Sequence, residues 1–333
     1  MTLKNNSNGS CEKQPVKAII ITGPTASGKT SISLQGARGL GGEILCCDSM
    51  QVYKHMNIGT AKPTAEEQQR VPHHLLDLVE PWEEFSVADY CRVAEAVARD
   101  VSSRGKIPLF VGGTGLYVTS LVEGYSYETG YQSDMAIRSE LEKKAKTQKG
   151  LEELYRFLYE HDPEAAAKIH IHNVKRLVRA VELYKMTGQT QQQRNVASKR
   201  DGSFLDASVF AVDLDRAALY ARINRRVDDM IEEGLIEEVE GLLNLCKERG
   251  KSISKTAAQA IGYKETIAYL NGNLDKDAMI EEIKSATRRY AKRQLTWLRK
   301  WPWVKWVRPF DCCKNETISD VLSHFSKDTN NFS

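Results

Sequence analysis

Residues 17–30 read KAIIITGPTASGKT, and the fold expected for the whole chain depends on this stretch. Residues 18–21 are an alanine and three β-branched isoleucines, which is typical of a strand buried on both faces of a parallel sheet. The run ends in the pattern G-x-x-x-x-G-K-T, which begins at Gly23 and ends at Thr30. Glycines at both ends allow the backbone to turn tightly and to point several N–H groups at one anion. The stretch therefore predicts a phosphate-binding loop between a strand and a helix.

The loop is predicted to hold a diphosphate or a triphosphate. Lys29 adds a mobile positive charge, Thr30 offers a hydroxyl to a phosphate-bound Mg²⁺, and the helix that starts there directs its positive dipole end into the same hollow. A glycine-rich turn with a solvated lysine is the alternative, and it leaves most of the pattern unexplained. The pattern does not identify the molecule that carries the phosphates. The residues predicted to bind them are Gly23, Pro24, Thr25, Ala26, Ser27, Gly28, Lys29 and Thr30.

The composition is that of an ordinary soluble globular protein of about two domains, with 333 residues, 41% of them hydrophobic and 27% charged. Residues 1–15 are polar and lack the apolar core of a secretion signal, so we expect a cytoplasmic protein with no membrane contact. The seven cysteines include two adjacent pairs and no C-x-x-C pair, which argues against a disulfide framework and against a zinc site. The net charge is only +3, so nucleic-acid binding would require positive charge concentrated in one region.

The first half alternates between strand and helix patterns, which predicts an α/β fold with a P-loop NTPase-like parallel sheet flanked by helices. A strand is predicted at 73–79, and a helix capped by Ser86 at 87–103. Asp48 directly follows a predicted strand at 43–47, at the sheet edge where ligands bind in open α/β proteins. The same position is equally typical of a helix N-cap. Thr114 lies in a second glycine turn, after an apolar strand at 107–111. It is a candidate to contact a ligand at the same edge, although the turn could simply lead into the next helix.

The pattern changes after Gly124. Residues 134–186 are predicted to be helical, with Gly188 placed to cap the last helix, and an apolar strand returns at 208–214, so the helical block is most simply an inserted domain. The chain is again predicted to be helical from residue 215 to about 301. The predicted parts are a disordered N-terminal arm at 1–15, the first part of the P-loop core at 16–130, an inserted helical domain at 131–205, the rest of the core with a basic helical C-terminal region at 206–310, and a mobile tail at 311–333.

Two groups of basic residues in the second half are candidates for binding phosphates. Arg222 and Arg226 are four residues apart on a predicted helix, so they share a face and could clamp a diphosphate, unless they form ordinary surface ion pairs. Residues 284–308 contain nine Lys or Arg, no acid and five aromatic residues, a mixture that suits a nucleic-acid backbone. The alternative is that the rings pack on the core beneath a solvated basic face. We expect that the rings mostly pack and the charges mostly bind.

Eight sequence blocks carry a resemblance to a known family. Together they resemble the tRNA dimethylallyltransferases, the isopentenyl-tRNA transferases of bacteria, over residues 16–308. Each block alone is a weak signal, but eight in the same order and spacing are specific. The resemblance implies transfer of a dimethylallyl group from dimethylallyl diphosphate to N6 of adenosine 37, in the anticodon loop of certain tRNAs. The blocks are GPTASGKT, DSMQVY, IGTAKP, VGGTGLY, KRLVRAVELY, LYARINRRVDDMIEEGLIEEV, QAIGYKE and YAKRQLTWLRK.

The resemblance implies a role for each candidate catalytic residue. Asp48 would take the proton from the adenine amine, with Thr114 helping to position it. Arg222, Lys29 and a Mg²⁺ held near Thr30 would neutralise the leaving diphosphate, with Arg226 beside them. Dimethylallyl diphosphate is then the co-substrate and Mg²⁺ the cofactor, and no nucleoside triphosphate is required.

The resemblance also implies an extended contact with tRNA. The target adenine must leave its stack, which a single-stranded loop makes comparatively cheap, while the helical insertion closes on the anticodon stem. We expect the protein to act as a monomer. Arg138 stands beside a segment that departs from the family pattern. The residues implied to contact tRNA are Asp48, Ser49, Met50, Gln51, Arg138, Lys175, Arg176, Leu177, Val178, Arg179, Gln259, Gly262, Tyr263, Lys264, Lys292, Arg293, Gln294, Trp297 and Arg299.

Three other functions are weighed against this one. A P-loop kinase for a small molecule would use the same loop, magnesium and arginines, but has no need of Asp48 or of the basic aromatic segment. A transferase that prenylates free adenine nucleotides, as the cytokinin-forming relatives do, would need neither the insertion nor that segment. A non-catalytic RNA-binding module would leave the phosphate loop without a purpose.

Overall fold

The computed structural model describes residues 14–124, 134–198 and 203–308, together with Ser323. The chain divides into two compact units, one made of residues 1–122 and 203–333 and the other of residues 123–202. Apart from Gln14, Pro15 and Ser323, the predicted N-terminal arm and C-terminal tail lie outside the described residues. Among the residues that are described, no helix is both long enough and apolar enough to cross a membrane.

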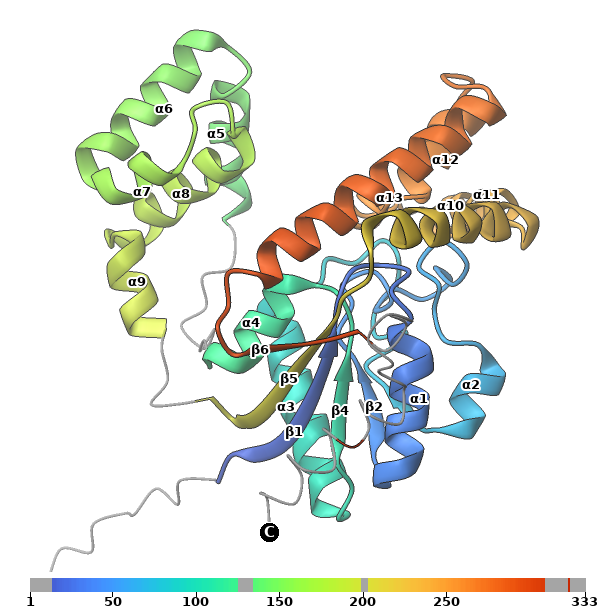
Figure 1. Cartoon of the computed structure of the whole chain (residues 1–333). Coiled ribbons are helices and arrows are strands. Elements are labelled where there is room, and N and C mark those ends of the chain that lie inside the picture. Colours follow the sequence, from blue (N-terminus) through green and yellow to red (C-terminus); the bar gives the residue numbers. More distant parts are fainter. Residues whose placement is uncertain (1–13, 125–133, 199–202, 309–322, 324–333) are drawn as a thin grey trace, which may run out of the picture. The chain divides into compact units, whose positions relative to one another are not determined.

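The first unit consists of a parallel sheet with helices on both faces and a further group of helices at one edge (Figure 1). Its elements before the helical unit are β1 (Val16–Thr22), α1 (Lys29–Leu40), β2 (Glu43–Cys46), α2 (Ala65–Arg70), β3 (His73–His74), α3 (Val87–Ser103), β4 (Pro108–Val111) and α4 (Gly115–Glu123). Those after it are β5 (Leu205–Val212), α10 (Arg216–Glu232), α11 (Leu235–Glu248), the 3₁₀ helix η1 (Ala257–Gln259), α12 (Tyr263–Leu270), α13 (Lys276–Leu298) and β6 (Val304–Val307).

The sheet has six strands in the order β3-β2-β4-β1-β5-β6, and every pair is parallel. β1 is central, with Ile20 opposite Phe110 of β4 on one side and Val209 of β5 on the other. The carboxyl ends of parallel strands meet at one edge of the sheet, where open α/β folds bind their ligands. The predicted fold class, a parallel sheet flanked by helices, is therefore confirmed.

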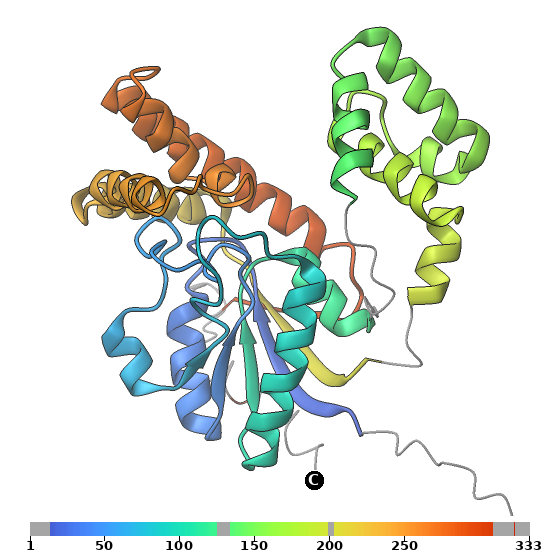
Figure 2. The ribbon, with the colours of Figure 1, turned by 180° about the vertical axis from the view of Figure 1, so that it is seen from behind.

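Both faces of the sheet are covered. Ile20 packs in a cluster with Tyr90 of α3 and Val118 of α4, whereas Ile19 and Ile21 pack with Ile32 of α1 on the opposite face. Figure 2 shows α3 in front of the sheet. The three isoleucines are fully buried, and burial of each stabilises the fold by roughly 2 kcal/mol. The continuous apolar run before the phosphate loop is thus explained by burial on both sides.

The helices α10 to α13 form a layer beyond the carboxyl edge of the sheet (Figure 1). They pack against the segment that follows β2, because Val52, Tyr53 and Met56 share a buried cluster with Leu235 of α11 and Met279 of α13. This packing holds the segment after β2 next to the loops at the strand ends.

The second unit is entirely helical in its described part. It has its own core, in which Leu141, Leu158, Leu177 and Val181 are buried together. Its last long helix ends as the sequence predicts, at Gly188, which adopts the left-handed conformation with φ 65°. The helices of the unit are α5 (Met135–Lys144), α6 (Gln148–His161), α7 (Pro163–Lys168), α8 (Val174–Thr187) and α9 (Gln191–Ser198).

Two strands differ from the sequence-based expectation. A strand is expected over residues 73–79, but β3 has only two residues, because Leu75 and Asp77 adopt left-handed conformations with φ 64° and 53° that end the extended run. β6 is not predicted at all. It is a four-residue strand that pairs with β5 from Val304 opposite Val209. Its pattern is too short to distinguish a strand from a turn.

Candidate active site

The loop between β1 and α1 has the backbone conformation that its glycines permit. Gly28 adopts φ 91° and directly precedes α1. A Cβ atom at Gly23 would lie 2.8 Å from the carbonyl oxygen of Val212, at the end of β5, so a side chain is excluded there. Because α1 begins at Lys29, the N–H groups of its first turn have no partner within the helix and are available to an anion.

Lys29 folds back over this loop. Its Nζ donates to the carbonyl oxygens of Gly23 at 3.0 Å and of Pro24 at 2.7 Å. The pKa of Lys29 falls to about 7, first because burial disfavours the charged form and then because Arg226 repels it, whereas Asp48 acts in the opposite direction. Lys29 can therefore take up a proton when an anion binds in the loop.

A cavity of about 330 Å³ lies at the carboxyl edge of the sheet. Its walls come from the phosphate loop, the segment after β2, the turn after β4, and one face each of α10 and α13. The lining residues are Thr25, Ala26, Ser27, Gly28, Lys29, Thr30, Ser33, Ile44, Cys46, Asp48, Gln51, Thr60, Ala61, Pro63, His73, Val111, Gly112, Gly113, Arg222, Arg226, Tyr290 and Gln294.

Arg222 and Arg226 line the cavity from successive turns of α10, as their spacing predicts. Burial lowers the pKa of Arg226, and the charge of Asp48 opposes that change. An arginine starts from a value so far above neutral that it stays charged. Together with Lys29, the two arginines make this cavity suited to an anion with several negative charges.

Asp48 is the acidic residue among the lining side chains. Its Oδ1 accepts the N–H of Met50 at 2.9 Å, and the residues that follow form turns. The alternative interpretation of Asp48 as a helix N-cap is therefore wrong, because no helix begins there. Thr114 lies next to this turn, since its Oγ1 accepts the N–H of Ser49 at 2.9 Å and its hydroxyl donates to Ser49 Oγ at 3.2 Å. The structure thus brings Asp48 and Thr114 together with the phosphate loop.

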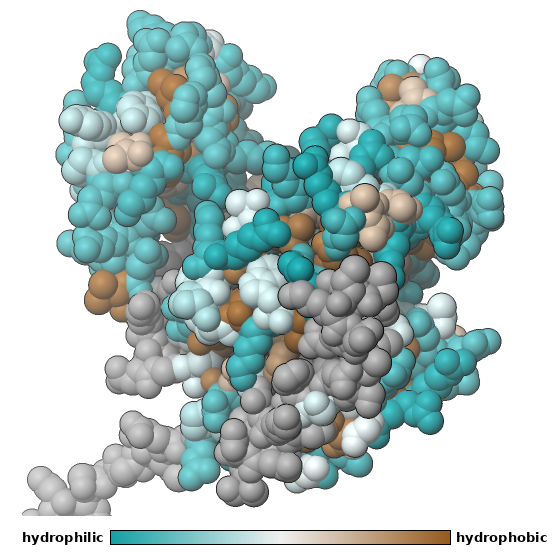
Figure 3. Space-filling model, in the orientation of Figure 1, coloured by the Kyte–Doolittle hydropathy of each residue, from teal (hydrophilic) through white to brown (hydrophobic). Residues whose placement is uncertain are grey.

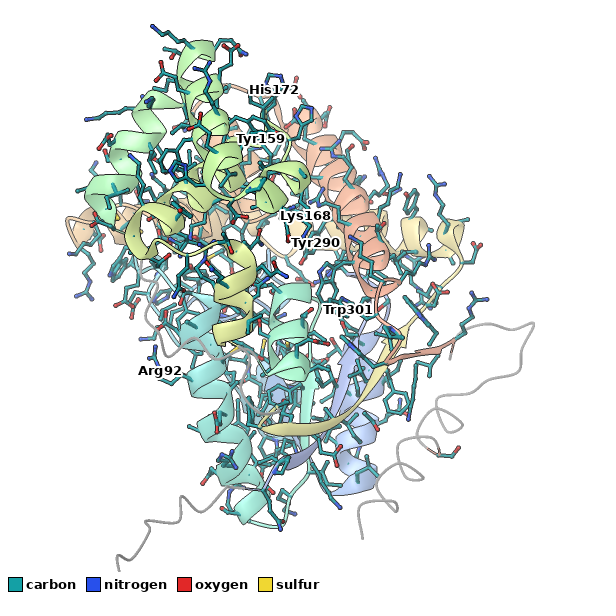
Figure 4. The ribbon with its side chains drawn as sticks, turned by 90° about the vertical axis from the view of Figure 1, so that its left-hand side faces the viewer. Arg92, Tyr159, Lys168, His172, Tyr290 and Trp301 are labelled. Carbon is teal, nitrogen blue, oxygen red and sulfur yellow. The ribbon has the colours of Figure 1, made fainter. Side chains whose placement is uncertain are left out.

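Several residues that line the cavity carry no sequence pattern that would predict a site. Tyr290, labelled in Figure 4, reaches the cavity from α13, and its pKa is raised by burial and by the charge of Asp48. His73 comes from β3, whose two adjacent histidines match no metal-binding or catalytic pattern. Thr60 and Ala61 belong to the block IGTAKP, which by itself is more typical of a turn. Only long-range packing brings these residues to one place.

The start of the IGTAKP segment is held in place by a carboxylate of α11. Glu238 of α11 accepts the N–H groups of Asn57 and Ile58 through Oε2, at 2.9 and 2.8 Å, and that of Gly59 through Oε1, at 3.2 Å. The hydroxyl of Tyr263 donates to the same Oε1 at 2.5 Å. On the inner side, Gln51 Nε2 donates to the carbonyl oxygens of residues 60 and 61, at 3.0 and 3.1 Å. The wall of the cavity is therefore fixed from both sides.

The donors at the site fit a magnesium ion that arrives with phosphate better than a resident ion. Nowhere in the described parts of the chain do three His, Cys, Asp or Glu side chains gather to hold a metal. Mg²⁺ characteristically keeps several waters and binds through few protein groups together with substrate phosphates. Thr30 is exposed in the first turn of α1, and the buried hydroxyl of Ser27 has no hydrogen-bond partner. Both hydroxyls remain available to phosphate oxygens or to such an ion.

The residues implied to contact tRNA in the first unit fall into two groups. Gln259, Lys264, Lys292, Arg293 and Arg299 are exposed. The others are buried or partly buried: Tyr263 is fully buried against Gly59, Gly262 is buried beside it, Gln294 is 7% exposed, and Trp297 is partly buried with its ring over Gly115. The tRNA contacts implied for Tyr263 and Gln294 stay predictions: Tyr263 is buried in the free protein, whereas Gln294 lines the cavity. Met50 and Gln51 are also partly buried, and Gln51 faces the cavity.

In the helical unit, the residues implied to contact tRNA also divide into exposed and buried ones. Lys175 and Arg176 are exposed at the start of α8, on a unit whose surface is mostly hydrophilic in the view of Figure 3. Arg138 and Arg179 both donate to Oε2 of the buried Glu182, at 2.7 and 2.9 Å. Leu177 and Val178 have side chains in the core of this unit, and the tRNA contact implied for this stretch of α8 stays a prediction. Their basic neighbours in sequence, Lys175 and Arg176, are exposed, so the burial of each residue depends on its direction around the helix.

The tryptophans of the basic segment mainly pack, as expected. Trp297, Trp301 and Trp303 lie against the core on the α3 side of the sheet, and the rings of Trp301 and Trp303 stack with centroids 5.3 Å apart. Trp301 is labelled in Figure 4. Trp306 is the exception, with 37% of its surface exposed. Packing of these rings fixes α13 and the strand that follows it to the sheet.

Comparison with known proteins gives consistent matches over most of the chain. The family model for IPP transferase matches residues 51–301, and that for isopentenyl transferase matches residues 16–78. A tRNA dimethylallyltransferase of Carboxydothermus hydrogenoformans is 45% identical over 290 residues, which make up 87% of this chain and 91% of that protein. A similar protein of Caldanaerobacter subterraneus subsp. tengcongensis is 43% identical over 293 residues, with the same coverage of both chains.

Solved structures agree. The full-length tRNA isopentenylpyrophosphate transferase of Bacillus halodurans is 40% identical, with a TM-score of 0.68 over 95% of this chain and 97% of that one. A eukaryotic dimethylallyltransferase, solved in the course of acting on tRNA, is 26% identical, with a TM-score of 0.77 over 95% of this chain and 80% of that one. With the family model covering well over half of its residues, this chain belongs to the IPP transferase family.

Proposed function

We propose that this protein transfers a dimethylallyl group from dimethylallyl diphosphate to N6 of adenosine 37 in the anticodon loop of tRNAs, giving N6-(dimethylallyl)adenosine and diphosphate. The observation that carries the proposal is the composition of the cavity. Lys29, Arg222 and Arg226 line it together with Asp48, so a place for a diphosphate adjoins a potential base. Several relatives carry the name tRNA dimethylallyltransferase, which supports tRNA as the acceptor.

The proposed step is a substitution at the allylic carbon. The bond between that carbon and the N6 nitrogen forms, the bond from the carbon to the diphosphate oxygen breaks, and Asp48 accepts the proton that the amine loses. The exocyclic amine is a poor nucleophile, so removal of this proton belongs to the reaction. Thr114 supports the base indirectly, because its hydrogen bonds to Ser49 fix the turn that carries Asp48.

The leaving group is stabilised by groups that line the cavity. The amides of the phosphate loop, Lys29, Arg222 and Arg226 offset the charge that builds up on the diphosphate. Protonation of Lys29 on binding adds a full positive charge to this set. A Mg²⁺ bound to the diphosphate would lie near Thr30 and would supply additional charge neutralisation when bound.

The tRNA is proposed to contact exposed basic residues of both units. Lys292, Arg293 and Arg299 surround the end of α13, whose inner face contributes Tyr290 and Gln294 to the cavity. Lys175 and Arg176 offer a second basic surface at the start of α8. Phosphate contacts of this kind position a nucleic acid without reading its sequence.

The test is an acceptor competition. Purified protein is incubated with Mg²⁺ and labelled dimethylallyl diphosphate, with unmodified tRNA that carries adenosine 37 or with AMP or ATP as acceptor. We expect label in the tRNA, and no label when adenosine 37 is replaced. Label only in free nucleotide would assign the protein to nucleotide prenylation. Absence of transfer, with ATP hydrolysis stimulated by a small metabolite, would favour the kinase.

A further inference from the structure

The side chain of Gln294 joins two loops of the active site. Its Oε1 accepts the N–H of Thr25, in the phosphate loop, at 2.9 Å. Its Nε2 donates to the carbonyl oxygen of Gly113, in the turn after β4, at 2.8 Å. The side chain is 7% exposed, and both ends of its amide are used. A residue with these contacts acts inside the protein.

The turn after β4 is shaped to receive α13. A Cβ atom at Gly113 would lie 2.2 Å from Nε2 of Gln294, and a Cβ at Gly115 would lie 2.6 Å from the ring of Trp297. Neither glycine has a positive φ, so close approach rather than backbone conformation excludes a side chain here. Gln294 and Trp297 are three residues apart on α13. The helix therefore meets the segment after β4 at two successive points, Gln294 against Gly113 and Trp297 against Gly115.

These contacts connect the two halves of the proposed chemistry. Thr25 belongs to the loop that would hold the diphosphate. Gly113 is bonded to Thr114, which is hydrogen-bonded to Ser49, the neighbour of Asp48. One side chain therefore spans from the leaving-group side of the cavity to the side that carries the base.

We propose that Gln294 is a positioning residue that sets the separation between the diphosphate-binding loop and the base Asp48. The inference rests on the proposed function, and it gives Gln294 a role distinct from the tRNA contact that the resemblance implies for it. The separation matters for the rate, because a displacement of about 1 Å between reacting groups can reduce a rate about 100-fold, even when each partner still binds. The helix that carries Gln294 also exposes Lys292 and Arg293, which lie two residues and one residue before it.

The test uses two substitutions and one matched control. Gln294→Met keeps the length of the side chain and removes both hydrogen bonds. Gln294→Glu keeps the acceptor for Thr25 but sets a carboxylate against the carbonyl of Gly113. The control, Thr296→Ala, changes an exposed residue of the same helix whose hydroxyl donates only to the backbone oxygen of Lys292. Thermal melting establishes that each variant folds.

Two measurements are made on each variant. The first is the affinity for inorganic diphosphate with Mg²⁺, measured by calorimetry without turnover. The second is a set of kinetic constants with dimethylallyl diphosphate and tRNA, together with the Kd for tRNA. For Gln294→Met we expect diphosphate to bind about tenfold more weakly and kcat to fall about 10- to 100-fold, with the Kd for tRNA within about twofold of wild type. The control is expected to match wild type in all of these.

The pH dependence of kcat in Gln294→Glu is a measurement that a purely structural role of Gln294 would leave unchanged. Its protonated carboxyl can accept from Thr25 and also donate to Gly113, and burial favours that neutral form. Its kcat relative to wild type should therefore rise about fivefold as the pH is lowered from 8 to 5.5. A ratio that stays constant with pH would contradict the hydrogen bond to Gly113.

The remaining outcomes separate this inference from the proposed function. If diphosphate affinity and kcat of Gln294→Met match the control, or if its Kd for tRNA rises in step with the fall in kcat, the positioning role is overturned. If wild type binds diphosphate but transfers no label, the proposed function fails, and the diphosphate affinities still decide whether Gln294 organises the loop. A wild type that binds no diphosphate overturns both.

Discussion

Asp48 shows how little a single residue's sequence context decides. An aspartate directly after a strand is as typical of a helix cap as of a ligand group, and the structure excludes the cap because the residues after Asp48 form turns and no helix begins there. Its position in a cavity with three basic side chains then favours chemistry. Those basic side chains come from segments that are remote in sequence from Asp48.

At this site we expect Asp48→Asn to lower kcat by about 10²- to 10⁴-fold, because an amide cannot accept the proton of the amine. The change is nearly isosteric, so the Kd for tRNA should stay within about threefold of wild type. Asp206→Asn, at an exposed position of β5, is the matched control. Transfer of label and filter binding measure the two quantities. An equal loss of binding and transfer would show that Asp48 holds the RNA instead of acting as a base.

Lys29 makes the binding of diphosphate dependent on pH. Its pKa is lowered to about 7, so the ammonium is present below that pH and is lost as the pH rises through it. The anion prefers the protonated form, so affinity for diphosphate should fall between pH 6 and 8.5. Arginine stays charged over this range. We therefore expect the affinity of wild type relative to Lys29→Arg to decrease by up to about tenfold per pH unit above 7, as measured by calorimetry.

The comparison with Lys29→Arg removes the ionisation of diphosphate itself, which affects both proteins equally. Parallel pH profiles for the two proteins would show that Lys29 is already charged in the empty site. Proton uptake on binding, obtained from calorimetry in buffers of different ionisation enthalpy, provides an independent check near pH 8.

At the scale of elements, the segment after β2 is held by α11 through Glu238. This carboxylate accepts three successive backbone N–H groups, from Asn57 to Gly59, and the hydroxyl of Tyr263. Tyr263 also fills the space beside Gly59, where a Cβ would lie 2.4 Å from its ring. Through Tyr263, the block QAIGYKE thus supports the wall of the cavity.

We expect Glu238→Ala to raise KM for dimethylallyl diphosphate by about tenfold, because three backbone N–H groups lose their acceptor and the wall that carries Thr60 and Ala61 loosens. Tyr263→Phe removes one donor and retains the packing, so its effect should be smaller, about 1 kcal/mol in stability. Glu240→Ala, at an exposed position of the same helix, is the control. Steady-state kinetics and thermal unfolding measure these effects. An unchanged KM in Glu238→Ala would mean that packing alone holds the wall.

At the scale of the whole molecule, basic residues proposed to contact tRNA occur in both compact units. Lys292 is exposed on α13 and Lys175 is exposed on α8. Each unit has its own buried core, so a change at one of these residues should leave the other unit intact. This separation allows the contribution of each unit to be measured independently.

Lys175→Glu and Lys292→Glu should each weaken tRNA binding and reduce the slope of log Kd against log salt by about 0.7 to 1, since each removes one phosphate contact. If a single tRNA engages both units at once, the free-energy losses of the double variant should add to within about 0.5 kcal/mol. Binding titrations between 50 and 300 mM salt supply both numbers. A double variant no weaker than one of the single variants would show that only one unit holds the RNA.

Much of the fold could be predicted because it depends on local patterns. The helix over 87–103 begins and ends where its capping serine and apolar spacing indicate, and Gly188 ends α8. The exceptions are short or strained. β3 stops where the backbone turns left-handed at Leu75, and β6 exists only because β5 offers it an edge. Such strands are defined by a partner and not by their own residues.

The sequence by itself determined the phosphate loop and the alternation that builds a parallel sheet, and its eight blocks indicated the family, because each of these depends on residues close together in the chain. Only the tertiary structure decided that Asp48, Arg222, Arg226 and Tyr290 surround one cavity, and that Tyr263 and Gln294 are buried. The physical reason is that burial, close approach to glycine and the pKa of Lys29 arise from packing between distant segments. Those quantities are set by the whole fold and have no local signature.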